Sequence, residues 1–146
     1  NFFDNYFLDA SPIMKEFFYE LQGYLWTLLD TYPTDLVGNI YEGINDIRFW
    51  PKKLLERYLG YIDQAYAAVE HIRTEDPVKY QNVRNSILLE SIFPRFAILE
   101  HHRGKFTTSE LNALIDEFER DCAHLRITNS AESTALASVI ASWRPN

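Results

Sequence analysis

Apolar side chains recur every three or four residues along most of this 146-residue chain. That spacing places them on one face of an α-helix. Strand-like alternation is scarce, and only five glycines interrupt the pattern. The periodicity therefore predicts an all-α fold. Because most connections between the expected helices are short, the predicted architecture is an antiparallel bundle of four to five helices.

Start and stop signals divide the pattern into five expected helices. Ser11 followed by Pro12 predicts the first start, because a serine hydroxyl caps free backbone N–H groups and proline fits the first helical position. Pro33 should end this helix near Thr31. The remaining expected helices run over about 51–75, 76–104, 107–127 and 133–143.

Two of these helices carry more specific signals. Thr107 and Glu110 have the Thr-x-x-Glu spacing of a capping box, and Phe118 follows on the apolar face as an expected core residue. Pro94 lies inside the expected helix 76–104 and predicts a kink about one turn earlier. The helix from Thr107 is therefore the best defined in the chain.

Residues 32–50 break the helical pattern. Proline, glycine, asparagine and aspartate alternate there with apolar side chains, so we expect one long loop packed onto the domain. Tyr41, Arg48 and Trp50 are the candidate interface or ligand contacts in this loop. Trp50 is the strongest candidate because it ends the loop beside Pro51.

Length and charge limit the classes of protein. The length fits a single α-helical domain over residues 1–146. With 21 acidic and 14 basic residues the formal net charge is −7, which disfavours duplex nucleic acid and anionic membrane surfaces as partners. No apolar run approaches the roughly 18 residues of a membrane span. The single cysteine excludes an internal disulfide and a cysteine-based zinc site.

Motifs for catalysis and for cofactors are absent from the sequence. It contains no phosphate-binding glycine loop and no nucleophile elbow. His101 and His102 are adjacent, so they point in different directions on a helix and do not form a chelating pair. Cys122 falls on an apolar face, where a buried thiol stays protonated. We therefore assign no catalytic residue, no cofactor site and no metal ligand.

Arginines and aromatic residues leave two interpretations open. Arg84 and Arg95 are three helical turns apart and could line an anion site, although salt bridges with the many acids are the commoner role. Flat aromatic rings can stack on sugars, but they also dominate the cores of domains this size. The candidates for either role are Trp26, Trp50, Trp143, Tyr41 and Tyr61.

Four segments resemble, in order, the helical region that follows the barrel in the DUF4838 family of glycoside-hydrolase-like proteins. The first runs from Asn5 to Phe18 and combines an aromatic stretch, small residues, a proline and an amphipathic helix. The other three are residues 54–65, 83–90 and 118–128. The match rests on helix patterning and short runs, not on catalytic residues.

The resemblance implies a C-terminal accessory domain of a longer, secreted or periplasmic bacterial protein with an α-glucuronidase- or hexosaminidase-like plan. Such a domain is not catalytic by itself, because the active site of a (β/α)8 barrel lies on barrel loops. The start of the sequence at Asn1, in mid-pattern, favours the same interpretation. The implied partner is the barrel domain of the parent chain, with homo-oligomers and carbohydrate as further open partners.

Two other interpretations remain. A stand-alone acidic helical interaction protein, of the immunity or adaptor type, explains the charge of −7 equally well. A small all-helical enzyme would require a polar cavity lined by residues such as Arg84 and Arg95. An exposed apolar patch on the first helix and the loop 32–50 would instead favour packing against the barrel domain.

Overall fold

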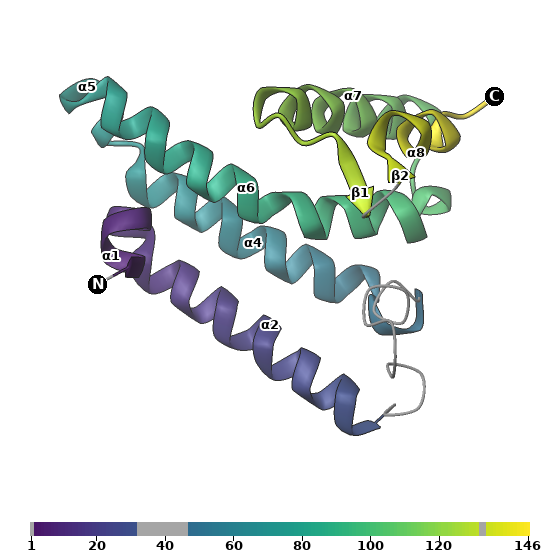
Figure 1. Ribbon diagram of the computed structural model, residues 1–146, viewed down its shortest axis with the longest axis horizontal. Coiled ribbons are helices and arrows are strands. Elements are labelled where there is room, and N and C mark those ends of the chain that lie inside the picture. Colours follow the sequence, from purple (N-terminus) through teal and green to yellow (C-terminus); the bar gives the residue numbers. More distant parts are fainter. Residues whose placement is uncertain (1, 32–46, 132–133) are drawn as a thin grey trace. The chain divides into compact units, whose positions relative to one another are not determined.

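A computed structural model describes residues 2–31, 47–131 and 134–146 (Figure 1). The described chain is helical almost throughout, which confirms the predicted all-α bundle. It divides into two compact units, unit 1 (residues 1–91) and unit 2 (residues 92–146). We describe each unit by itself.

Unit 1 is built around two long helices, α2 (Ser11–Thr31) and α4 (Lys52–Val69), which pack side by side and run in opposite directions (Figure 1). The ring of Phe17 on α2 lies 5.4 Å from that of Tyr58 on α4, measured between centroids. Burial of one apolar stripe per helix holds the pair together. Fully buried members of this core are Phe7, Ala10, Met14, Phe17, Leu55, Tyr58, Ala65 and Val69.

A short aromatic helix precedes the expected first helix. α1 (Phe2–Phe7) continues through a 3₁₀ turn, η1 (Leu8–Ala10), directly into α2. Leu8 has a φ of 50°, a left-handed conformation that breaks α1 from η1. The predicted helix start at Ser11 is confirmed, since α2 begins there, but the predicted capping role of Ser11 is wrong. Ser11 already has helical angles, and its hydroxyl donates to Asp4 Oδ1 at 2.7 Å.

The expected helix 51–75 is two helices, since α4 ends at Val69 and a single turn, α5 (Ile72–Glu75), follows. α6 (Pro77–His101) then starts where predicted, and Asp76 Oδ1 accepts the backbone N–H of Lys79 at 3.1 Å. This bond is a side-chain cap of the helix N-terminus. α6 continues through Pro94, and the boundary between the units falls in the turn before that proline. The predicted kink stays a prediction.

Unit 2 combines the end of α6 with a 3₁₀ turn, η3 (Arg103–Lys105), α7 (Thr108–His124) and α8 (Leu136–Trp143). The predicted capping box is confirmed: Glu110 N donates to Thr107 Oγ1 at 3.1 Å, and Thr107 N donates to Glu110 Oε1 at 2.9 Å. Phe118 is fully buried, as predicted. Its buried neighbours are Leu99, Leu111, Ile115, Cys122, Leu136, Ile140 and Trp143.

The segment between α7 and α8 differs from the expectation. Two short strands, β1 (Asn129–Ala131) and β2 (Thr134–Ala135), pair antiparallel there, and α8 starts three residues later than predicted. Strands of three and two residues are too short to show alternation in a sequence. Among the described residues, no helix has the length and apolarity that crossing a bilayer requires.

Candidate functional site

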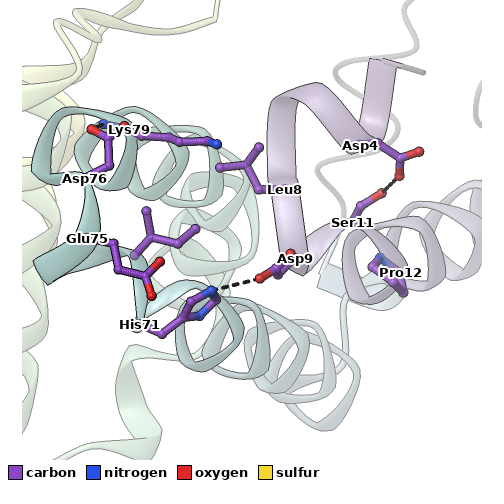
Figure 2. Close-up of a pocket in the computed structure, with 10 residues that line it drawn as sticks. Asp4, Leu8, Asp9, Ser11, Pro12, His71, Glu75, Asp76 and Lys79 are labelled. Carbon is purple, nitrogen blue, oxygen red and sulfur yellow. Dashed lines mark hydrogen bonds and ion pairs between the residues drawn. The ribbon is translucent and has the colours of Figure 1, made fainter.

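A cavity of about 760 Å³ opens in unit 1 between the N-terminal segment and the start of α6 (Figure 2). Asp4, Asp9, Glu75 and Asp76 give it four carboxylates, against one lysine and one histidine. Its lining residues are Asp4, Leu8, Asp9, Ser11, Pro12, His71, Ile72, Glu75, Asp76 and Lys79. The cavity is therefore acidic and suited to positively charged groups rather than to anions.

Hydrogen bonds and ion pairs already engage much of this lining. His71 Nε2 lies 2.9 Å from Asp9 Oδ2, so the segment before α5 is tied to η1 (Figure 2). Asp4 accepts the Ser11 hydroxyl and lies 3.7 Å from Lys15 Nζ. The Ser11 hydrogen bond lowers the pKa of Asp4 against the opposing effect of desolvation, and the charge of Lys15 lowers it further. Asp4 and Asp9 therefore connect neighbouring helical segments through hydrogen bonds and ion pairs.

The described residues do not bring a metal site together. Nowhere in the described ranges do three or more histidine, cysteine or acidic side chains meet in an arrangement that could hold a metal ion. Cys122 is buried in unit 2, and desolvation raises the pKa of its thiol to about 11. A protonated, inaccessible thiol is a poor nucleophile, as the sequence predicted.

The three predicted contact residues differ in where they lie. Tyr41 lies outside the described residues, as does most of the expected long loop. Arg48 is exposed, and its guanidinium lies 5.1 Å from the centroid of the Phe49 ring. Trp50 is only 1% exposed, with its ring 5.5 Å from that of Tyr24 on α2. Their role as interface or ligand contacts stays a prediction, although the structure places Trp50 in the core of unit 1.

Arg84 and Arg95 each have contacts within their own unit. The Arg84 guanidinium lies 5.3 Å from the centroid of the Tyr66 ring in unit 1. In unit 2, Arg95 Nη2 lies 2.8 Å from Asp121 Oδ2, and both side chains are mostly buried. Salt bridging, the commoner role weighed from the sequence, is thus what Arg95 does in the structure.

A charged cluster between α2 and α4 was not predicted. Arg57 on α4 holds Glu20 on α2 through two hydrogen bonds, of 2.8 Å from Nε and 2.5 Å from Nη2, and Tyr61 Oη donates to the same carboxylate at 2.6 Å. We call these three residues the Glu20 clasp. The Arg57 hydrogen bonds are the main cause that lowers the pKa of Glu20 to about 2, while desolvation opposes them. The partners are 37 residues apart, so no local pattern reveals them.

The outer side of α2 carries the most exposed aromatic side chains of that helix. Tyr19 is 74% exposed and Trp26 is 61% exposed. A Cβ placed on Gly23, between them on the same side, would meet no atom within 4 Å. Trp26 was a candidate from the sequence, but Tyr19 was missed, although the seven-residue spacing between the two is visible there.

Comparison of the chain with family models, with curated proteins and with solved structures gave no match. In the part of the chain that the structure describes, the protein is all-α, with an acidic cavity and an exposed aromatic side of α2 in unit 1.

Proposed function

We propose that the chain is a non-catalytic helical accessory domain of a secreted or periplasmic bacterial glycoside-hydrolase-like protein, and that it packs on a (β/α)8 barrel. The observation that carries the proposal is the pair of aromatic side chains on the exposed side of α2. One side of this helix is buried against α4, while Tyr19 and Trp26 are exposed on the other. Large exposed aromatic side chains in one row are typical of a surface that another polypeptide covers.

Two further features support this assignment. The four segments that resemble the DUF4838 family fall on helical parts of the chain, in α1–η1–α2, α4, α6 and the C-terminal part of α7 with the turn after it. The titratable groups of the acidic cavity serve largely as ion pairs and caps, as with Asp9 and Asp76. Binding to another domain accounts for these features without any chemistry in this chain.

The test is the size of the native polypeptide that carries this sequence. An antibody raised against the chain is used on a lysate and on the medium of the source organism. A band several times larger than 17.2 kDa supports an accessory domain, and its presence in the medium or periplasm supports the proposed location. A band near 17.2 kDa overturns the proposal.

A second measurement tests the packing itself. Amide hydrogen exchange along α2 is compared between the isolated chain and the native protein. Stronger protection of residues 16–30 in the native protein is expected if another domain covers this side. Equal protection in both samples contradicts packing through α2.

The second candidate function is a stand-alone acidic interaction protein of the immunity or adaptor type. The formal charge of −7 and the acidic cavity favour it, because both complement a basic partner. A native polypeptide near 17.2 kDa that co-purifies with a basic protein supports this candidate over the first.

A further inference from the structure

A regular stripe of five residues runs along the outer side of α2. Glu16, Tyr19, Gly23, Trp26 and Asp30 are spaced by three, four, three and four residues, the heptad spacing of a helix side that meets another helix. All five are exposed. The buried residues of the same helix, Met14, Phe17 and Leu28, lie on the opposite side. We call these five residues the α2 stripe.

Elsewhere in unit 1, aromatic rings and carboxylates share an arginine. In the Glu20 clasp, the Arg57 guanidinium lies 5.7 Å from the centroid of the Tyr61 ring while it binds the carboxylate. Arg73 repeats this arrangement: it lies 5.0 Å from the Tyr80 ring centroid and 3.1 Å from Glu70 Oε1. An arginine fits this place because its planar cation both stacks on rings and binds carboxylates.

The α2 stripe has the aromatic and acidic members of such a group but no cation. All 14 lysines and arginines of the chain lie in the described residues, and none of them stacks on the ring of Tyr19 or Trp26. Among the same residues, the side chains of Glu16 and Asp30 form no ion pair or hydrogen bond. The charge of the stripe therefore complements a basic surface. A second copy of this chain, with its charge of −7, is electrostatically disfavoured as the occupant.

We propose that the α2 stripe binds a helix of a partner protein that presents two arginines seven residues apart. One arginine stacks on Tyr19 beside Glu16, and the other stacks on Trp26 beside Asp30. Seven residues advance a helix by about 10 Å, so equal spacing on both helices keeps the pairs in register. Gly23 leaves open space between the two pairs, which lets the partner backbone approach closely.

This proposal rests on the proposed function only in taking the occupant to be another polypeptide. The outer ring of a (β/α)8 barrel consists of helices, so a helical occupant is consistent with that function. The stripe itself is defined by the contacts and exposures of unit 1.

The experiment uses the complete chain and a synthetic helix of about 20 residues, capped at both ends and rich in alanine and glutamine. In the probe peptide two arginines are seven residues apart. In the control peptide, of equal composition, they are five residues apart and lie on different sides of the helix. Binding is followed by titration calorimetry and by tryptophan emission. Trp26 is the exposed tryptophan among the three, because Trp50 and Trp143 are buried.

The expected result is that the probe binds at least about tenfold more tightly than the control peptide and shifts the emission of Trp26. Tyr19→Ala with Trp26→Ala should remove the binding, and Glu16→Gln with Asp30→Asn should weaken it about tenfold. The matched variant is Asp63→Asn with Glu117→Gln, which changes the net charge equally at exposed sites off the stripe. It should bind the probe as the parent chain does.

Equal binding of the two peptides, or equal weakening by the matched variant, would show non-specific attraction and overturn the proposal. So would a concentration-dependent dimer that Trp26→Ala abolishes, or a β-linked oligosaccharide that shifts Trp26 emission when the peptide does not. If the native polypeptide is large and the probe fails, the accessory-domain function stands and the α2 stripe proposal falls. If the native polypeptide is small and the probe binds, the α2 stripe proposal stands and the accessory-domain function falls.

Discussion

The cores of the two units are held in different ways. In unit 2, α7 and α8 bury an apolar cluster in which the Phe118 ring lies 5.6 Å from the Trp143 ring, and the ion pair between Arg95 and Asp121 lies at its edge. In unit 1, the contact between α2 and α4 joins an aromatic core to the charged Glu20 clasp at its edge. An apolar cluster follows from which helix side is apolar, whereas a clasp depends on where two distant side chains meet. The two units should therefore respond differently to mutation and to acid.

The largest expected effect is the loss of the central ring of unit 2. Phe118→Ala should lower the free energy of unfolding by about 3–5 kcal/mol, because the side chain is fully buried and leaves a cavity. Urea unfolding followed by circular dichroism measures this. Leu114→Ala on the same helix, at a 36% exposed position, is the control and should cost far less. A near-neutral Phe118→Ala would contradict the packing of α7.

The corresponding test in unit 1 is Trp50→Ala. Trp50 is 1% exposed, so its removal should cost about 3–5 kcal/mol as well. The same measurement applies, with Trp26→Ala as the matched control, because Trp26 is 61% exposed. If Trp50→Ala leaves stability unchanged, Trp50 is a contact residue, as the sequence analysis expected, and not a core residue.

Much of unit 2 could be predicted because its signals are local. The capping box of Thr107 and Glu110 and the burial of Phe118 depend on spacings of a few residues. The strands β1 and β2 could not be predicted, since strands of three and two residues leave no periodic pattern. Local patterns thus specify helices and their buried sides but not short irregular pairings.

Unit 1 was harder to predict for two physical reasons. α1 is only six residues long, and the left-handed φ of Leu8, which separates α1 from η1 and α2, is uncommon for a residue other than glycine. The Glu20 clasp joins residues 37 positions apart, so only the packing of α4 on α2 creates it. The spacing of the α2 stripe is visible in the sequence, but which side of α2 stays exposed also depends on α4.

Acid tests the contact in unit 1, because the hydrogen bonds of the Glu20 clasp lower the pKa of a carboxyl group there. The folded-state pKa of Glu20 is lowered to about 2 from an ordinary value of 4.5. The stabilisation is therefore fully present above pH 4.5 and is lost as the pH falls toward 2. Because Glu20 and Arg57 are partly exposed, solvent screening keeps this effect well below that of Phe118→Ala.

The matching variant is Glu20→Gln, with Glu56→Gln on α4 as the control, since Glu56 forms an exposed pair with Lys52. Chemical denaturation between pH 2 and pH 7 measures the result. The Glu20→Gln protein should be less stable than the parent at neutral pH and should lose less stability on acidification. An unchanged acid dependence would mean that the clasp does not stabilise unit 1.

The smallest expected effect has the opposite sign. The hydroxyl of Tyr58 is buried at the contact of α2 and α4, and no hydrogen-bond partner for it is found among the described residues. Burial of such a group without a bond costs free energy, so Tyr58→Phe should stabilise the protein by about 0.5–1 kcal/mol. Desolvation also raises the pKa of Tyr58 to about 12, so its neutral form is favoured in the folded state.

The same substitution makes an alkaline prediction. With a folded pKa near 12 against an ordinary 10.0, the parent protein is expected to lose stability as the pH rises from 10 to 12. Tyr58→Phe should remove part of that loss, and Tyr61→Phe is the comparison, because that hydroxyl donates to Glu20 and its removal breaks the clasp. Denaturation at pH 7 and pH 11 separates the two variants. Destabilisation by Tyr58→Phe at pH 7 would mean that its hydroxyl has a partner after all, and that the α2–α4 contact is more polar than its aromatic core indicates.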